Sequence, residues 1–405
     1  MKPIVRAERM KPVHSDIRGP LFVEAMNRQK QGIDILKLNT GNPATFGFGL
    51  PDSIKNALME HMQDGVGYCD FKGMPQARQA ICDYETSKGI KGITPDDVFI
   101  GNGVSEVVSF ALTPLLNDGD EVLVPSPSYS LWGNSVYLED GKPVFYTCDE
   151  QANWYPDIQD IRSKITDKTK AIVIINPNNP TGVLYPKEIL LEIIQVAREF
   201  GLLIFADEIY DRLVMDGKQH ISLASLTEDV PVITLNGLSK SHCLCGYRCG
   251  WMVISGPREL TEDYRQGIIQ LTSLRLCANT MAQIVIPAAL DDMDTPASMV
   301  RPGGRIYEQR EATVRELEKI DGLSFVKNDG AFYIFPKLDV KKFNITNDKQ
   351  FAHDLLDATN ILLVPGSGFD WKDPDHFRIV MLPQADVLSD AIRRMGTFLD
   401  GYKQK

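Results

Sequence analysis

The sequence has little positive charge and no long apolar run. Its 43 lysines and arginines stand against 54 acidic residues, which gives a net charge of −11. Nucleic-acid binding and attachment to an anionic membrane both need a basic surface, so we expect neither partner. No stretch reaches the roughly 18 uninterrupted apolar residues of a membrane span. The N-terminus, MKPIVRAERMKPVHSDIRGP, is too charged for a signal peptide, so we expect a cytoplasmic protein.

Cysteines are few, and their spacing is irregular. Their number is odd, and they lack the spacing of a disulfide framework, so we expect free thiols. They stand at positions 69, 82, 148, 243, 245, 249 and 277. His242 with Cys243, Cys245 and Cys249 could be considered as metal ligands, but this spacing matches no common zinc pattern and a second CxxC pair is missing. Small thiols that pack in a loop explain the cluster better, and we expect no metal.

The middle of the chain alternates short apolar runs with amphipathic stretches, and it has no low-complexity tract or repeat. The run AIVII (171–175) predicts a buried strand, and PKEILLEIIQVAREFG (186–201) places its apolar residues on one helical face. LLIFA (202–206) predicts the next strand. The three segments form a β-α-β unit, whose strands should be parallel with a right-handed crossover.

Further apolar runs extend this pattern to a doubly wound α/β domain. They are DVFIG (97–101), EVLVP (121–125) and PVITL (231–235). The C-terminal third differs, with a helix pattern in RIYEQREATVRELEKI, two expected strands around a turn in GLSFVKNDGAFYIFPKL, and a strand in RIVML (378–382). We therefore expect a large domain over residues 51–292. Residues 293–405 should form a smaller α/β domain, which residues 1–50 should join.

Residues that could bind a ligand or take part in catalysis follow several of these strands. In an open parallel sheet, ligands bind beyond the carboxyl ends of the strands, so these residues should lie together. They are Gly103, Val104 and Ser105 at a helix start, then Tyr129, Asn179, Asp207, Tyr210, Ser239, Lys240 and Arg248.

Each of these residues also has an ordinary structural explanation. An isolated Asp207 is usually a helix cap, an isolated Tyr129 is usually part of the core, and an isolated Lys240 is usually a surface lysine. In a shared site, however, Lys240 could act as a nucleophilic amine, and backbone N–H groups at a helix start could bind an anion. Arg248, spaced between Gly246 and Gly250, could approach a phosphate in a bidentate manner. The order and spacing of the whole set favour the functional interpretation.

The motifs NPNNPTG, DEIYD and LSKSHCLCGYRCG together resemble the signature of the fold-type I, class I/II aminotransferases, which use pyridoxal 5′-phosphate (PLP). The resemblance covers nearly the whole chain, from LNTGNP through GYCDFKGMPQARQAI to FRIVML. Within the family, segments such as DIRGP, NGLSK and PGGRIYEQR are most similar to the bacterial glutamate–pyruvate (alanine) aminotransferases. The resemblance to this family implies an aspartate aminotransferase-like fold with a large, mainly parallel-sheet domain and a smaller α/β domain.

The resemblance also implies roles for individual residues. Lys240 corresponds to the lysine that binds the cofactor covalently and shuttles the substrate α-proton, and Asp207 to the acid at the pyridine nitrogen. Residues implied to contact the cofactor elsewhere are Tyr210 and Asn179 at the ring hydroxyl, Tyr129 against the ring, and Val104, Ser105, Ser239 and Arg248 at the phosphate. Tyr68 corresponds to a tyrosine that reaches the cofactor phosphate of a neighbouring subunit, which implies a homodimer. Arg378 and Gly41 are implied to bind the substrate carboxylate. Asn179 is implied to contact the substrate as well, and Arg18 is a further candidate.

Two residues depart from the family pattern. Gly237 stands where many members have a phosphate-binding serine, so Ser239 or backbone groups would substitute for it. Ser15 stands where the alanine-specific branch is expected to have a tyrosine. The implied reaction moves an amino group between L-alanine and 2-oxoglutarate. An aminotransferase for another small or branched amino acid, a PLP-dependent lyase and a non-enzymatic regulator on the same fold are alternatives.

Overall fold

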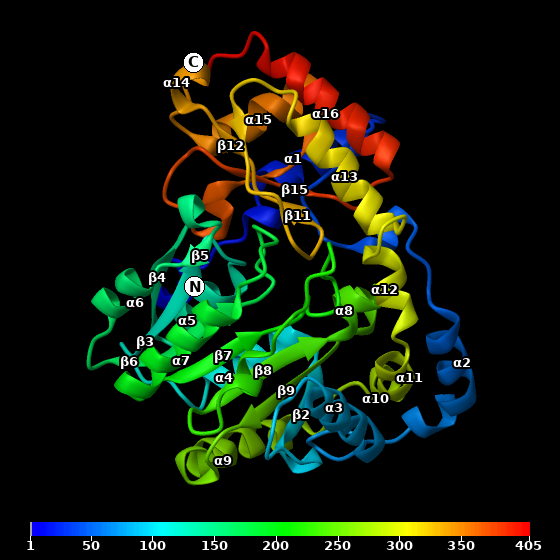
Figure 1. The fold of residues 1–405 in the computed structure, drawn as a ribbon, viewed down its shortest axis with the longest axis vertical. Helices are drawn as coiled ribbons and strands as arrows, with labels where there is room; N and C mark the ends of the chain where they lie inside the picture. Colours follow the sequence, from blue (N-terminus) through cyan, green and yellow to red (C-terminus); the bar gives the residue numbers. More distant parts are fainter. Residues whose placement is uncertain (1) are drawn as a thin grey trace.

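A computed structural model describes residues 2–405 and shows a larger part with a smaller part above it in Figure 1. The strands of the larger part are β2 (Val98–Asn102), β3 (Glu121–Ser126), β4 (Lys142–Asp149), β5 (Tyr155–Pro156), β6 (Thr169–Ile175), β7 (Leu203–Asp207), β8 (Val232–Gly237) and β9 (Cys249–Ser255). They form one sheet in the order β2-β9-β8-β7-β6-β3-β4-β5. Strand β9 is antiparallel to both neighbours and β5 is antiparallel to β4, whereas all other adjacent pairs are parallel.

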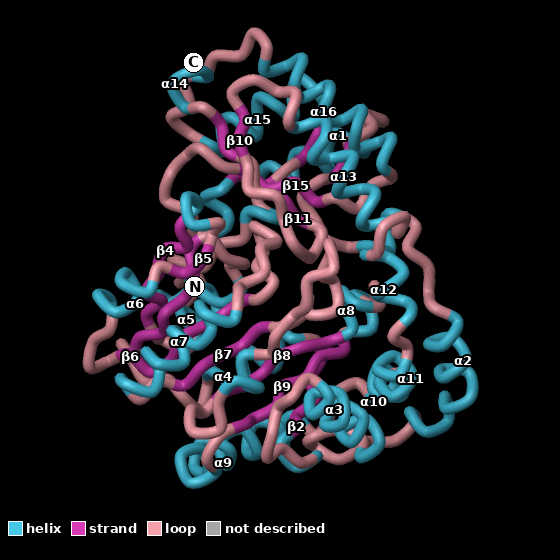
Figure 2. The backbone as a smooth tube through the Cα atoms, viewed as in Figure 1, coloured by secondary structure: helices cyan, strands magenta, loops and turns pink. Residues whose placement is uncertain are grey.

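The helices account for most of the remaining chain (Figure 2). The α-helices are α1 (Pro20–Lys30), α2 (Asp52–His61), α3 (Pro75–Ser87), α4 (Val104–Leu112), α5 (Leu131–Leu138), α6 (Ile158–Lys164), α7 (Lys187–Phe200), α8 (Leu238–Ser241), α9 (Arg258–Arg275), α10 (Thr280–Ile284), α11 (Ile286–Asp291), α12 (Asp294–Val300), α13 (Arg305–Leu317), α14 (Val340–Phe343), α15 (Asp348–Thr359) and α16 (Ala385–Leu399). The 3₁₀ helices used below are η2 (Asp16–Arg18), η4 (Met62–Gly65), η8 (Cys245–Tyr247) and η9 (Gly366–Phe369).

The predicted β-α-β unit is confirmed. Strands β6 and β7 are parallel, and Ile172 is paired with Ile204 in the register. Helix α7 connects them and buries the apolar face that the sequence indicated. It ends at Gly201, whose φ of 65° lies in the left-handed region that glycine adopts without steric cost.

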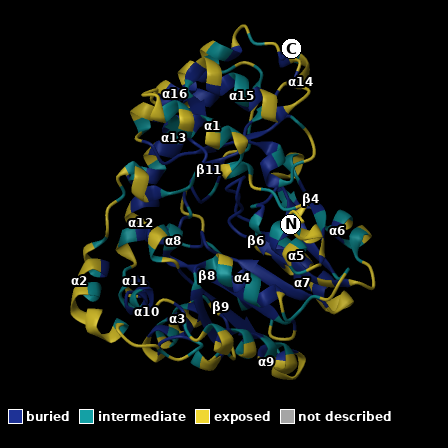
Figure 3. Ribbon diagram, turned by 180° about the vertical axis from the view of Figure 1, so that it is seen from behind, coloured by how far each residue is buried: buried dark blue, intermediate teal, exposed yellow. Residues whose placement is uncertain are grey.

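The large sheet lies between two layers of helices. Ile172 and Ile174 of β6 face one layer, where they share a core with α6 and α7. Val173 and Ile175 face the opposite layer and pack with α4, α5 and α9. This alternation follows from the two-residue period of a strand, and a strand covered on both faces reads as a continuous apolar run. Figure 3 shows the strands of this sheet mostly buried beneath helices with exposed outer surfaces.

The smaller part combines the N-terminal segment with the C-terminal third. Strand β1 (Leu36–Lys37) pairs in parallel with β13 (Ile361–Leu362), which joins segments far apart in the sequence. The other strands are β10 (Leu323–Ser324), β11 (Tyr333–Ile334), β12 (Lys337–Leu338), β14 (Val364–Pro365) and β15 (Phe377–Val380). They form a three-stranded sheet β11-β15-β14 and a pair β10-β12, which share one core with α13, α15 and α16.

The expectation of two strands around a turn in residues 322–338 is confirmed only in part. This segment contains three short strands, of which β10 pairs with β12 while β11 pairs with β15. The stretch between β10 and β11 instead contacts the larger part, because Met215 donates its N–H to the carbonyl of Asp329 at 2.8 Å and Ala331 donates to Leu213 at 2.8 Å. The stretch between the paired strands is therefore a long excursion towards the larger part and not the short turn that the local pattern favoured.

Within residues 2–405, no single helix combines the length and the apolar composition of a membrane span. One sharply bent pair, Arg258–Arg275 with Thr280–Asp291, meets both criteria when its two helices are taken together, with a bend of 119°.

Candidate active site

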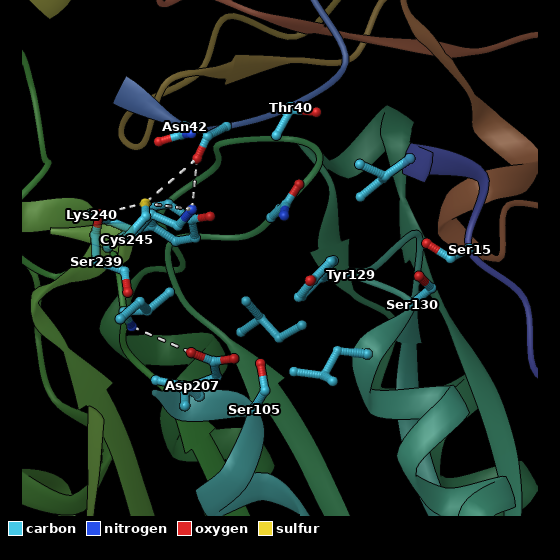
Figure 4. Close-up of a pocket in the computed structure, with 18 of the residues that line it drawn as sticks. Ser15, Thr40, Asn42, Ser105, Tyr129, Ser130, Asp207, Ser239, Lys240 and Cys245 are labelled. Carbon is cyan, nitrogen blue, oxygen red and sulfur yellow. Dashed lines mark hydrogen bonds between the residues drawn. The ribbon is translucent and has the colours of Figure 1, made fainter. Parts of the chain in front are cut away.

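A cavity of about 840 Å³ lies where the carboxyl ends of the central strands face the smaller part (Figure 4). It brings together every predicted site residue except Tyr68. These residues are Arg18, Gly41, Val104, Ser105, Tyr129, Asn179, Asp207, Tyr210, Ser239, Lys240, Arg248 and Arg378. Tyr68 does not line the cavity, and its side chain is 84% exposed.

Lys240 projects into the cavity from α8, the short helix that directly follows β8. Its ammonium group donates a hydrogen bond to the carbonyl of Gly41 at 2.9 Å and lies 4.0 Å from Sγ of Cys245. Burial, the largest influence, lowers the pKa of Lys240, but Tyr333 and Cys245 raise it in their charged forms, so that it lies above its usual value.

Asp207 ends β7 and is a buried acid without a cationic partner among residues 2–405. Its Oδ2 accepts the indole N–H of Trp132 at 3.1 Å, and its Oδ1 accepts the backbone N–H of Ile209 at 3.4 Å. Burial raises the pKa of Asp207 to about 6, although both hydrogen bonds lower it. A cationic group brought next to this carboxylate would therefore stabilise its ionised form.

The neighbouring acids point into a separate buried cluster. Glu208 and Asp211 contact Nζ of Lys88 at 2.7 and 3.1 Å, and Ser222 donates to Glu208 at 2.9 Å. Lys88 also contacts Glu85 at 2.7 Å. Lys88 therefore supplies a cation to all three of these acids, whereas Asp207 lines the cavity without one.

Arg378 is a fully buried cation on β15 that has no acidic partner among the described residues. It donates to Oδ1 of Asn179 at 2.9 Å and to the carbonyl of Asn39, while its Nε has no hydrogen-bond partner. Its guanidinium lies between two rings, with the centroids of Tyr333 and Phe369 at 4.5 and 4.6 Å. Burial lowers the pKa of Arg378, as expected for a desolvated cation that lacks a counter-ion.

Tyr333 is a cavity residue that the sequence analysis missed. Its hydroxyl lies 3.0 Å from the hydroxyl of Tyr210. Burial raises the pKa of Tyr210 well above its usual value, and the nearby Tyr333 raises it further. A Cβ at Gly41 would lie 2.2 Å from the Tyr333 hydroxyl. Glycine at position 41 therefore allows the segment that accepts the Lys240 hydrogen bond to approach Tyr333 closely.

The N-terminus of α4 and Arg248 form a concave basic surface at one end of the cavity. Gly103 has a φ of 83°, and a Cβ there would lie 2.3 Å from Nη2 of Arg248. A Cβ at Gly250 would lie 2.4 Å from the backbone nitrogen of Val104. These glycines let the guanidinium approach the first N–H groups of α4, which lack intrahelical partners. Such a cradle suits a phosphate group.

These observations fit the phosphorylated pyridine aldehyde that the family resemblance implies. The cavity offers an amine, an acid without a counter-ion, aromatic and hydroxyl side chains, and a basic cradle. The buried guanidinium of Arg378 remains for a second anion. A PLP-sized ligand and a carboxylate would together satisfy the charges that the protein leaves unpaired.

The structure shows the surroundings of Gly237 and Ser15, the two residues that depart from the family pattern. A Cβ at Gly237 would lie 2.6 Å from the carbonyl oxygen of Cys249, so the close pairing of β8 with β9 leaves no room there for a serine side chain. Ser239 instead lines the cavity, as does Ser15. Cys245, which the sequence analysis considered only as a metal ligand or loop thiol, also lines it and donates to the carbonyl of Ser239 at 3.0 Å.

Comparisons with known proteins agree with this geometry. Residues 33–394 match the family model described as aminotransferase class I and II. The chain is 50% identical over 404 residues to the glutamate-pyruvate aminotransferase AlaA of Haemophilus influenzae, with both chains fully covered. A crystal structure of an aminotransferase from Escherichia coli is 47% identical with a TM-score of 0.98, covering both chains fully. An alanine aminotransferase from Pyrococcus furiosus is 41% identical with a TM-score of 0.93, covering 98% of this chain and 100% of that chain.

Proposed function

Because the chain belongs to the class I and II aminotransferase family, with the fold that the sequence analysis expected, we propose that it transfers an amino group between L-alanine and 2-oxoglutarate. The products would be pyruvate and L-glutamate, formed in two half-reactions on PLP. The similarity to an enzyme named glutamate-pyruvate aminotransferase and to a structure named alanine aminotransferase supports this substrate pair. The observation that carries the proposal is one cavity that contains the amine of Lys240, the unpaired acid of Asp207 and the unpaired cation of Arg378.

The proposed cofactor-binding residues each supply one type of contact. Asp207 would hold the protonated ring nitrogen, since a cation there stabilises the ionised form of this buried acid. Tyr210 and Asn179 would hydrogen-bond the ring oxygen, and Tyr129 would pack on the ring. The phosphate would bind to Arg248, Ser239 and the N–H groups of Val104 and Ser105, with Tyr68 contributed by a second subunit.

When bound, PLP supplies a protonated ring that spreads the negative charge left by removal of a substrate proton. The protein residues provide binding, orientation and proton transfer. Arg378 would hold the substrate carboxylate in a bidentate manner, assisted by the backbone at Gly41 and by Arg18. Nζ of Lys240 would covalently hold the cofactor at rest and would act as the base for the α-proton once substrate has displaced it.

The organisation of the protein is part of the proposal. We propose a large domain over residues 51–292 and a small domain over residues 293–405 that residues 1–50 complete. The pairing of β1 with β13 supports the assignment of the N-terminal segment. We also propose a homodimer in the cytoplasm that acts on amino acids and 2-oxo acids, without nucleic acid or membrane as a partner.

A half-reaction screen tests the proposed function. Holoenzyme mixed with single amino acids should lose its PLP spectrum with L-alanine and L-glutamate, and 2-oxoglutarate or pyruvate should restore it. Lys240→Ala should abolish turnover. Release of ammonia from L-alanine without a 2-oxo acid would indicate a lyase instead. A stronger response to valine, 2-aminobutyrate or aspartate would identify a different aminotransferase.

A further inference from the structure

The segment that precedes α1 borders the mouth of the cavity. Ser15, Ile17 and Arg18 line it from this segment, and Asn134 and Leu138 of α5 line it as well. Figure 4 shows Ser15 near Ser130, which directly precedes α5. The segment therefore lines the same cavity as Arg378 and Lys240.

His14 joins this segment to α5 through its backbone. Its N–H donates to Oδ1 of Asn134 at 3.1 Å, and Nδ2 of Asn134 donates back to the carbonyl of His14 at 2.5 Å. These two hydrogen bonds fix the peptide units on both sides of His14, directly before Ser15. The backbone of this segment is thus anchored to a residue that itself lines the cavity.

The imidazole of His14 links two further elements. Nε2 lies 3.2 Å from Oδ1 of Asp370, which ends η9, and Nδ1 lies 3.6 Å from Oδ2 of Asp16 in η2. Asp16 also contacts Nζ of Lys349 in α15 at 3.0 Å. The histidine is therefore the centre of a small charged cluster that connects the N-terminal segment with α5, η9 and, through Asp16, with α15.

Ile17 packs against the core of the larger part, but few other polar side-chain contacts hold the segment in place. Asn39 donates from Nδ2 to the carbonyl of Ile17 at 2.9 Å. Within residues 2–405, the side chains of Ser15 and Arg18 make no hydrogen bond or ion pair, although both line the cavity. The contacts of His14 and Asp16 are thus a large share of what fixes Ser15 and Arg18 beside it.

Resting on the proposed function, we propose that His14 is a positioning residue that fastens residues 14–18 at the cavity mouth and favours dicarboxylate substrates over monocarboxylates. Asp16 and Asp370 place negative charge beside the segment that substrates pass. The cation of His14 offsets this charge, together with Lys349. Without it, the excess negative charge would oppose 2-oxoglutarate and glutamate, which carry two carboxylates, more than pyruvate and alanine, which carry one.

The surroundings of His14 keep its imidazole charged at neutral pH. Hydrogen bonds to Asp16 and then to Asp370 raise the pKa of His14 to about 9, although burial opposes them. Tyr137 of α5 also faces this cluster, and its pKa is raised by burial and then by Asp370. Because the pKa of His14 is raised on folding, the stabilisation is fully present below about 6.5 and is lost as the pH rises through about 9.

Steady-state kinetics at pH 7.5 test the proposal with two variants of His14. His14→Gln should raise KM for 2-oxoglutarate by about two- to five-fold, the effect expected for loss of one partly exposed charge pair, with less change in KM for pyruvate or in kcat. His14→Lys keeps a cation and should restore most of the 2-oxoglutarate KM. Arg9→Gln removes an exposed ion pair to Asp140, outside the cavity, and serves as the matched control that should leave both KM values unchanged. Equal effects of His14→Gln and His14→Lys, or equal effects on both acceptors, would overturn the proposal.

A titration that does not depend on activity tests the charge itself. The histidine ring protons of the holoenzyme are followed by NMR from pH 5.5 to 10, and the signal of His14 among the six histidines is the one missing in His14→Gln. It should titrate near pH 9, and titration near 6.5 would overturn the proposal. If His14 titrates near 9 but no amino transfer occurs, the proposed function fails. If amino transfer occurs but His14→Gln leaves the KM values unchanged, this inference fails.

Discussion

The indole N–H of Trp132 lies 3.1 Å from Oδ2 of Asp207, and both side chains are buried. Trp132 comes from α5 and Asp207 from the end of β7, so the hydrogen bond joins a covering helix to the edge of the sheet that lines the cavity. A neutral donor orients the carboxylate but supplies no counter-charge. The ionised form of Asp207 is therefore energetically unfavourable in the protein without ligand, and a cation bound beside it would stabilise this form.

Asp207→Asn should stabilise the apoprotein and abolish binding of the cofactor with a protonated ring nitrogen. A rise of the Asp207 pKa from 3.8 to about 6 corresponds to a penalty of roughly 3 kcal/mol for the ionised acid in the folded state. The penalty is present above pH 6 and disappears as the pH falls through 6 towards 3.8, because both states then bind the proton. Urea unfolding of the apoprotein should show a stabilised variant at pH 8 and a smaller gain at pH 5.

Asp211→Asn is the matched control for that prediction. Asp211 is equally buried, but Lys88 overcomes the effect of burial and lowers its pKa. Its loss should destabilise the apoprotein at pH 8. If both variants were destabilised at pH 8, the idea that Asp207 waits for a cation would be wrong.

The sequence predicts the residues that follow the strands of the large sheet because parallel strands end at one edge. Asp207 directly follows one buried apolar run, and Lys240 follows another after the residues NGLS, so their convergence in the cavity needs only the order of the strands. The helix of residues 187–200 was predictable for a similar reason, since its apolar period and its terminal Gly201 are local signals.

Other parts of the site depend on contacts that no local pattern contains. Tyr333 reaches the cavity because β11 pairs with β15 rather than with the strand before it. Strand β9 was also not predicted, because the cysteines and glycines at its start are typical of a loop. The structure shows that Gly250 is needed there because it lies close to the backbone of Val104. The raised pKa of His14 arises first from Asp16, two residues away, but also from Asp370, which is 356 residues away in the chain.

Arg378→Ala should chiefly weaken the binding of amino acids. Removing one partner of a desolvated charge pair costs about 2–5 kcal/mol, or at least about 30-fold in half-saturation. Arg378→Lys should recover only part of this loss, because an ammonium cannot form two parallel hydrogen bonds to a carboxylate. The half-reaction with L-alanine, followed at increasing concentration, gives the value for each variant. An unchanged half-saturation in Arg378→Ala would exclude the proposed contact.

Gly103→Ala should weaken retention of the cofactor phosphate. The new Cβ would meet Nη2 of Arg248 at 2.3 Å and push the guanidinium out of the cradle. Gly32→Ala is the control, since Gly32 also has a positive φ, 87°, but nothing lies within 4 Å of its Cβ. Both variants should lose roughly 1–3 kcal/mol of stability through backbone strain, but only Gly103→Ala should release PLP faster. Equal release rates, measured by dialysis and absorbance, would argue against the cradle.

The exposed side chain of Tyr68 predicts that a complete site needs two subunits. Large apolar side chains are exposed nearby, on two segments joined by the hydrogen bond from Arg275 to the carbonyl of Phe71 at 3.3 Å. They are Met62, Val66, Leu274 and Leu276. An exposed apolar surface of this kind is typical of a subunit interface. We therefore expect a dimer in sedimentation analysis, and loss of activity in Tyr68→Phe through a missing phosphate hydrogen bond.

Mixed dimers distinguish a contribution by Tyr68 across the interface from one within its own subunit. If Tyr68 acts on the neighbouring site, a dimer of one Lys240→Ala chain and one Tyr68→Phe chain contains one complete site and one doubly defective site. Co-refolding should then yield more activity than either parent. A mixture of Lys240→Ala with Tyr210→Phe provides the control, because Tyr210 lies in the same cavity as Lys240 and no complete site can form. Recovery in the second mixture, or its absence in the first, would contradict a contribution of Tyr68 across the interface.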